Sequence, residues 1–177
     1  PCMLGGVAAW LRWRARRKAA GKPYDKPNLI MSTAYQVVWE KFCQLWQIEM
    51  RTVPITSKHP TLDIERAIEM CDENTICIVP IAGVTWTGMN DDIEALNDAL
   101  EQYNRITGYD IPIHVDAASG GFILPFINPE KKWDFRLKWV LSISTSGHKY
   151  GLVYPGLGWI VWKDRKYLPD EMSFSVN

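Results

Sequence analysis

Short apolar segments alternate with helical patterns along most of this chain, and no other feature restricts the possible fold as strongly. The segment 75–82, Thr-Ile-Cys-Ile-Val-Pro-Ile-Ala, is apolar almost throughout, so the strand it forms should be buried on both faces. In the following segment, 91–106, Ile93, Leu96 and Leu100 recur at helical spacing. Strands buried on both faces and separated by helices are typical of a mostly parallel sheet covered by helices on both sides. The sequence therefore predicts an α/β fold.

The same patterns predict the remaining elements. We expect helices over 2–20, 34–47, 61–71 and 91–106, and strands over 28–33, 48–55, 75–82, 111–115, 140–143 and 158–162. In sheets of this class, ligands bind beyond the carboxyl ends of the strands. Side chains that directly follow a strand are therefore the first candidates for a functional site, and so is the loop 83–88.

The charge balance argues against nucleic-acid and membrane partners. The chain has 20 basic and 20 acidic residues, so no global field attracts a polyanion or a lipid surface. The basic run at 12–18 could form a nucleic-acid patch, but a solvated last helical turn is the favoured interpretation. No apolar run reaches the roughly 18 residues that a membrane-spanning helix needs.

The cysteines suggest a reducing environment. The chain has four of them, Cys2, Cys43, Cys71 and Cys77, and no two form a C-x-x-C pair. With only three histidines in the chain, a structural zinc site is not expected, and no other metal site is proposed. We expect free, mostly buried thiols and a cytoplasmic location.

Two stretches carry residues suited to chemistry. Asp116 lies directly after the apolar run of 111–115, and Lys149 follows a second apolar run, 33 positions later. A lysine amine can bond covalently to the aldehyde of pyridoxal phosphate (PLP), and a carboxylate can partner its pyridinium nitrogen. Separately, each residue also has an ordinary interpretation, as a surface lysine and a capping carboxylate. Their shared position at strand ends favours a PLP site.

Residues near Asp116 and Lys149 in the sequence can be interpreted in more than one way. Ala118, Gly120 and Gly121 could leave room for a planar ring, or form a turn that needs positive φ. His148 lies beside the lysine, and a functional role is favoured for it. His114 points to the same strand face as Asp116, so it could approach the cofactor or satisfy a buried hydrogen bond.

Several motifs together resemble a known family. The segments H-V-D-A-A-S-G-G-F (114–122), W-D-F-R-L (133–137) and S-I-S-T-S-G-H-K-Y-G-L (142–152) closely resemble the glutamate decarboxylases among the PLP-dependent group II decarboxylases. C-M-L-G-G at 2–6 and G-V-T-W-T-G at 83–88 extend the resemblance over nearly the whole chain. The resemblance implies the large domain of a fold type I PLP-dependent transferase, which is aspartate-aminotransferase-like.

The resemblance also implies roles for individual residues. Lys149 would be the PLP-linked lysine and Asp116 the partner of the pyridinium nitrogen. The other cofactor-binding residues would be Ala118 and Gln36 on the two ring faces, Thr85 near the cofactor hydroxyl and substrate, and Ser146 and His148 around the phosphate and the linked aldehyde carbon. His148, Lys149 and Asp116 form the expected catalytic set.

The implied activity is the conversion of L-glutamate to 4-aminobutyrate and CO2 by a homodimer or a higher homo-oligomer. Residues 1–177 would then be the middle portion of the PLP-binding large domain. An N-terminal segment, a phosphate-binding serine pair just before Cys2 and a C-terminal small domain would lie outside the chain. Two alternatives remain: another PLP-dependent amino-acid decarboxylase or lyase, and a catalytically inert truncated fragment.

Overall fold

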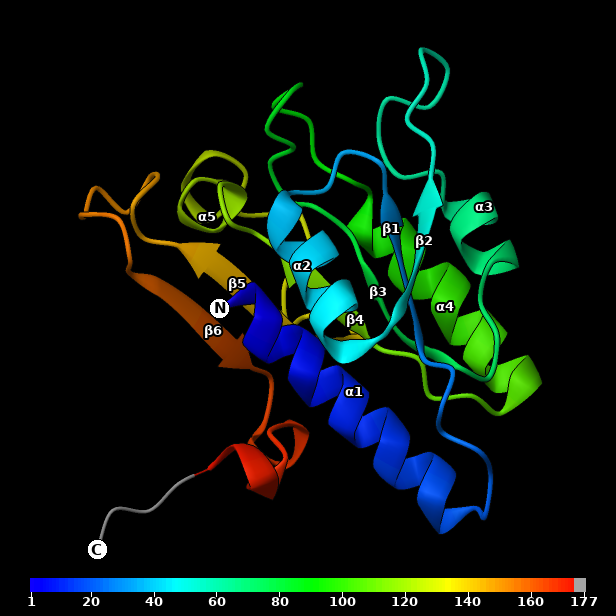
Figure 1. The fold of residues 1–177 in the computed structure, drawn as a ribbon. Helices are drawn as coiled ribbons and strands as arrows, with labels where there is room; N and C mark the ends of the chain where they lie inside the picture. The colour runs from blue at the N-terminus through cyan, green and yellow to red at the C-terminus, as the bar shows by residue number, and fades with distance from the viewer. Residues whose placement is uncertain (174–177) are drawn as a thin grey trace, which may run out of the picture.

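The computed structural model of the protein describes residues 1–173, whose strands form one sheet flanked by helices (Figure 1). The helices are α1 (Cys2–Ala19), α2 (Val37–Trp46), α3 (Ile64–Glu69), α4 (Ile93–Thr107) and α5 (Leu124–Ile127). The strands are β1 (Asn28–Ser32), β2 (Glu49–Val53), β3 (Thr75–Val79), β4 (Ile113–Asp116), β5 (Val140–Ser146) and β6 (Gly158–Trp162). Three short 3-10 helices complete the described elements, η1 (Gly120–Phe122), η2 (Arg165–Tyr167) and η3 (Asp170–Met172).

The sheet has the order β2-β1-β3-β4-β5-β6. The pairs from β2 through β5 are all parallel, and only β6 runs antiparallel, against β5. The predicted mostly parallel sheet is confirmed. The carboxyl ends of the parallel strands meet at the upper edge of the sheet in Figure 1.

Helices cover both faces of the sheet, as predicted. Leu29 and Met31 of β1 pack in the core on the side of α1 and α2, the two helices drawn in front of the sheet in Figure 1. Ile30, between them, packs on the opposite side with Leu96 and Leu100 of α4. This alternation within a wholly buried strand is what a sheet between two helical layers requires.

Element boundaries differ from the sequence prediction where local chemistry decides them. The second helix begins at Val37 rather than at 34, because Gln36 is extended and acts as the N-cap. The third begins at Ile64 rather than at 61, because the Asp63 side chain accepts a hydrogen bond from the Arg66 N–H. The predicted strand 75–82 ends at Val79, since Pro80 has no N–H to continue the ladder. The short helix α5 was not predicted.

The prediction of free, mostly buried thiols is confirmed. All four cysteines are free, and Cys43, Cys71 and Cys77 are buried. Burial raises the pKa of both the Cys43 and the Cys71 thiol to about 12. Among residues 1–173, no helix combines the length and the apolar character needed to cross a bilayer.

Candidate functional site

A cavity of about 590 Å³ opens at the carboxyl edge of the sheet. Its walls come from three connections: the loop after β3, the turn and short helices after β4, and the loop after β5. Thr85, Ser119 and Lys149 are among the polar residues that line it, next to apolar side chains such as Ile123 and Leu124. A concave, mostly apolar site with a few convergent polar groups is the usual form of a small-molecule pocket.

Lys149 reaches this cavity from the loop that follows β5. Its side chain is half-buried, and Nζ donates a hydrogen bond to Ser119 Oγ at 3.3 Å. Because Ser119 lies three residues after Asp116, the amine is directed toward the end of β4. The structure therefore brings the two residues that were predicted from separate strand ends into one region.

Asp116 is the last residue of β4, and its side chain is almost fully buried, with 3% of the residue exposed. Its Oδ2 accepts a hydrogen bond from Trp39 Nε1 at 2.7 Å, and Oδ1 accepts one from the Ala118 N–H at 3.1 Å. Burial raises the pKa of Asp116, while these two hydrogen bonds and the charge of Lys149 oppose the rise. The carboxylate is thus buried, oriented by two donors and close enough to Lys149 to be influenced by its charge.

The other predicted site residues differ in how directly the structure connects them to Asp116 and Lys149. Gln36 Nε2 donates to Thr85 Oγ1 at 2.8 Å, which joins the start of α2 to the loop after β3. The Ser146 N–H donates to the Ala118 carbonyl at 3.2 Å, so β5 and the residues after β4 are in contact. His148 is exposed at the surface, and its predicted role stays a prediction.

The imidazole ring of His114 is buried and hydrogen-bonded within the protein. The ring is buried, with Nδ1 2.7 Å from Ser142 Oγ and Nε2 3.1 Å from Ser144 Oγ. Burial lowers the pKa of His114 to about 3, so the ring is neutral near pH 7. Both ring nitrogens are occupied by serine hydroxyls, which supports the buried hydrogen-bond interpretation over direct contact with a cofactor.

Close packing, rather than the predicted turn with positive φ, explains Gly120 and Gly121, while the predicted room for a planar ring stays a prediction. Neither Gly120 nor Gly121 has a positive φ. A Cβ at Gly120 would lie 2.6 Å from the Ala82 carbonyl oxygen, and one at Gly121 would lie 2.6 Å from Thr145 Oγ1. The glycines therefore allow this loop to pack directly against its neighbours, which positions Ser119 toward Lys149.

Trp39 is a component of the site that the sequence did not reveal. It is fully buried on α2, and its indole N–H binds Asp116, which is 77 positions away in the chain. The available signal was its place one helical turn after Gln36, on a helix that begins at the carboxyl edge. That position alone does not distinguish a site residue from a core aromatic.

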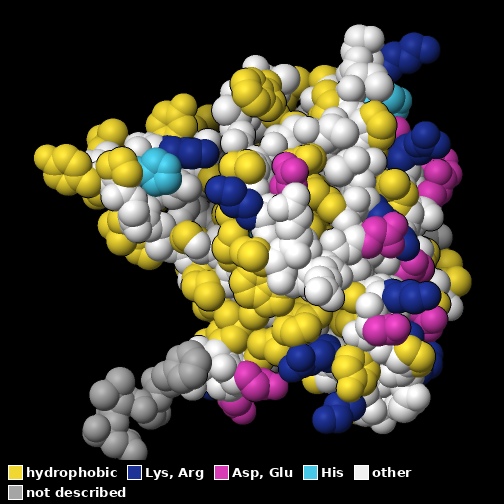
Figure 2. All heavy atoms as spheres, in the orientation of Figure 1, with side chains coloured by type: hydrophobic (Ala, Val, Ile, Leu, Met, Phe, Trp, Pro, Cys, Tyr) yellow, Lys and Arg dark blue, Asp and Glu magenta, His cyan; other side chains and the backbone are white. Residues whose placement is uncertain are grey.

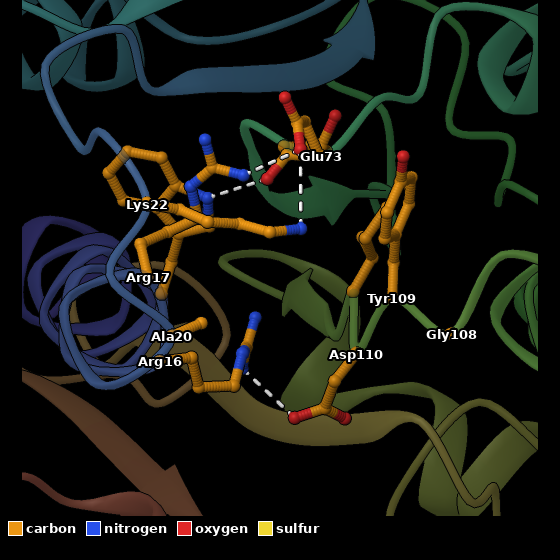
Figure 3. Close-up of a pocket in the computed structure, with 11 residues that line it drawn as sticks. Arg16, Arg17, Ala20, Lys22, Glu73, Gly108, Tyr109 and Asp110 are labelled. Carbon is orange, nitrogen blue, oxygen red and sulfur yellow. Dashed lines mark hydrogen bonds and ion pairs between the residues drawn. The ribbon is translucent and has the colours of Figure 1, made fainter.

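A second pocket of about 180 Å³ lies at the opposite edge of the sheet (Figure 3). Arg16 pairs there with Asp110 at 2.9 Å, and Arg17 pairs with Glu73 at 2.7 Å. Arg17 is only 9% exposed, so the predicted solvated last turn is wrong for this residue. Residues of the basic run are thus neutralised by carboxylates of the same chain, and the predicted site residues lie elsewhere.

The fold and the site together define a PLP-dependent α/β protein of fold type I: a parallel sheet with a buried carboxylate and a lysine following neighbouring strands. The chain belongs to the pyridoxal-dependent decarboxylase family, whose conserved domain matches residues 1–177.

Individual relatives agree with this family. The chain is 54% identical to a glutamate decarboxylase of Lactococcus lactis and 55% identical to glutamate decarboxylase beta of Listeria monocytogenes, over 99% of its length in each case. The solved structure of a Lactobacillus brevis glutamate decarboxylase matches with 52% identity and a TM-score of 0.95 over 99% of the chain. The chain spans 38% of the two sequence relatives and 40% of the solved chain.

Proposed function

We propose that the full-length protein uses PLP to decarboxylate L-glutamate to 4-aminobutyrate and CO2. The observation that carries the proposal is the placement of two groups at the ends of the neighbouring strands β4 and β5: the buried Asp116 carboxylate ends β4, and the Lys149 amine follows β5, lines the cavity and binds Ser119. The identity of 52–55% to glutamate decarboxylases supports the choice of substrate.

The donor set fits the cofactor. When bound, PLP supplies an electron sink that accepts the electrons of the bond between the α-carbon and the departing carboxylate. Lys149 would hold the aldehyde carbon, and Asp116 would keep a proton on the pyridine nitrogen. A carboxylate that already accepts two hydrogen bonds is held in one orientation, which suits that task.

The other predicted residues would orient the ring and the phosphate. Ala118 and Gln36 would lie on the two faces of the ring, with Thr85 beside Gln36. Ser146 and His148 would serve the phosphate side. Helix α1 begins at this edge, since Cys2 Sγ lies 3.3 Å from Ser144 Oγ, and a helix N-terminus favours phosphate through its free N–H groups.

We place the chain in the middle of a PLP-binding large domain, within a cytoplasmic homodimer or higher homo-oligomer. Side chains after β5 and on α5 support a partner surface: Leu152 is 90%, Tyr154 92% and Phe126 81% exposed. Figure 2 shows hydrophobic side chains gathered on the projection at its upper left, which the β5–β6 connection forms in Figure 1. Exposed apolar clusters of this kind mark interaction sites.

The test is chemical labelling of the full-length protein. PLP is added, the covalent link is fixed by borohydride reduction, and the labelled peptide is mapped. Label on Lys149 together with release of 4-aminobutyrate and CO2 from glutamate is the expected result. Label without turnover of glutamate would favour another amino-acid substrate, and a folded protein without label would favour the inert alternative.

A further inference from the structure

The indole of Trp39 is the side-chain hydrogen-bond donor to the buried carboxylate of Asp116. The mechanism proposed above assigns it no role, although the contact is short, at 2.7 Å, and both residues are buried. We propose that Trp39 is a positioning residue, which fixes the orientation of Asp116 and thereby its interaction with the pyridine nitrogen of PLP. This inference rests on the proposed function.

The position of the indole is itself fixed by packing. Its ring makes edge-on contacts with Phe42, at 6.1 Å between centroids, and with His114, at 5.3 Å. Phe42 lies one turn further along α2, and His114 is held by two serine hydroxyls. The N–H is therefore directed at Asp116 by an indole ring that is packed against two other buried rings, as a group that orients another must be.

The chemistry of the donor matches the form of Asp116 that PLP requires. An indole N–H can only donate, so it binds a carboxylate oxygen that carries no proton. With the Ala118 N–H on the other oxygen, each carboxylate oxygen has one donor among residues 1–173. Loss of one donor would make Asp116 more basic, and the proton of the pyridine nitrogen would be less securely retained there.

Helix α2 connects the contact between Trp39 and Asp116 to Gln36, a second residue of the proposed site. Gln36, at its N-cap, is the residue proposed to lie on the ring, and Trp39 is one turn later. One short helix would thus position both a ring-contacting side chain and the group that orients Asp116. A shift of α2 would alter both at once.

The experiment compares Trp39→Phe with Trp13→Phe in the full-length protein loaded with PLP. Each substitution keeps a buried aromatic ring and removes one indole N–H; that of Trp13 donates to the Glu73 carbonyl at the opposite edge. PLP affinity is measured by absorbance titration, and the protonation of the pyridine nitrogen by 15N NMR of labelled cofactor. Glutamate turnover gives kcat and KM separately.

We expect Trp39→Phe to weaken PLP binding by about tenfold or more, the range for a hydrogen bond to a charged group. The 15N signal should move toward that of a neutral pyridine, and kcat should fall more than KM changes. Trp13→Phe should leave all three readouts at their wild-type values. If Trp39→Phe behaves like Trp13→Phe, the positioning role is wrong.

A benzothiophene analogue of tryptophan at position 39 covers the case in which Trp39→Phe does not fold, because it keeps the ring shape and lacks the N–H. Its 15N shift and PLP affinity decide the proposal in the same way. Wild-type protein that binds PLP without turning over glutamate would contradict the proposed substrate, while the comparison of cofactor binding would still test Trp39.

Discussion

Lys149 Nζ donates a hydrogen bond to Ser119 Oγ at 3.3 Å, and this contact ties the loop after β5 to the loop after β4. Ser119 is followed by Gly120, whose lack of a side chain lets the loop approach the Ala82 carbonyl. The lysine that the sequence placed beside a strand end is therefore directed to the neighbouring strand end by a close-packed turn. This placement supports the covalent role proposed for Lys149.

Lys149→Ala in the full-length protein should abolish glutamate decarboxylation and covalent retention of PLP after borohydride reduction. The substitution removes the amine to which the aldehyde binds, so no other change in the site compensates. Mass spectrometry of the reduced protein and a 4-aminobutyrate assay provide the measurement. Lys163→Ala is a suitable control, because that lysine binds the Leu137 carbonyl away from the cavity. Full turnover in Lys149→Ala would contradict the assignment.

Thr85→Val should weaken PLP binding by about two- to tenfold, because it removes the hydroxyl that holds the Gln36 amide. The effect should be modest, since Thr85 is exposed and water can replace part of the contact. Absorbance titration with PLP gives the affinity. Thr87→Val removes a hydroxyl from the same loop, one that accepts from the Met89 N–H, and should change PLP affinity less. Equal effects of the two substitutions would show that PLP affinity depends on the loop as a whole and not on the contact between Thr85 and Gln36.

The general architecture could be predicted because it depends on patterns within each segment. Buried strands such as 75–79 are apolar on both faces, and the helix Ile93–Thr107 has its apolar residues at helical spacing. Strand β5 was predicted too short, to 143, because Ser144, Thr145 and Ser146 read as a loop. Their strand conformation comes from pairing with β6, for example Ser144 with Ile160, which is a long-range effect.

The site was predictable only in part for the same reason. Asp116 and Lys149 follow apolar runs, so their position at one sheet edge follows from the fold class. The partners of Asp116 do not: the Trp39 N–H reaches it from a helix far away in the sequence. The role of His114 also depended on Ser142 and Ser144, which are brought beside it by the pairing of β4 with β5.

His114→Gln should make the stability of the full-length apoprotein less dependent on acid pH. The folded pKa of His114 is about 3, below the unfolded value of about 6.5, so the folded state binds fewer protons in this interval. The stability contributed by the neutral ring is complete above about pH 6.5 and is lost as the pH falls toward 3, by up to about 1.4 kcal/mol per pH unit.

Urea unfolding between pH 7.5 and about 4.5 measures this difference. At pH 7 the variant should be less stable by about 1–3 kcal/mol, because two buried hydrogen bonds are disturbed. Its loss of stability on acidification should be smaller than that of the wild type. His59→Gln, at an exposed loop position, controls for a general effect of removing an imidazole. Parallel pH profiles for wild type and His114→Gln would refute the linkage.

Leu152→Glu should weaken the proposed homo-oligomer of the full-length protein. Leu152 is 90% exposed in the β5–β6 connection, near Tyr150 and Tyr154 in the sequence. Its φ of 56° is uncommon for a residue other than glycine. A glutamate there would bury an unpaired charge in an apolar contact, and the free energy of its desolvation would oppose association. Light scattering after size exclusion measures the mass as a function of concentration.

Leu45→Glu is the matched control for this substitution, because Leu45 is also highly exposed, at 70%, but lies on α2 away from the β5–β6 connection. We expect it to keep the wild-type mass. If Leu152→Glu lowers the mass and Leu45→Glu does not, the β5–β6 connection forms part of the subunit interface. If the mass is unchanged at every concentration, the apolar connection does not form a subunit interface.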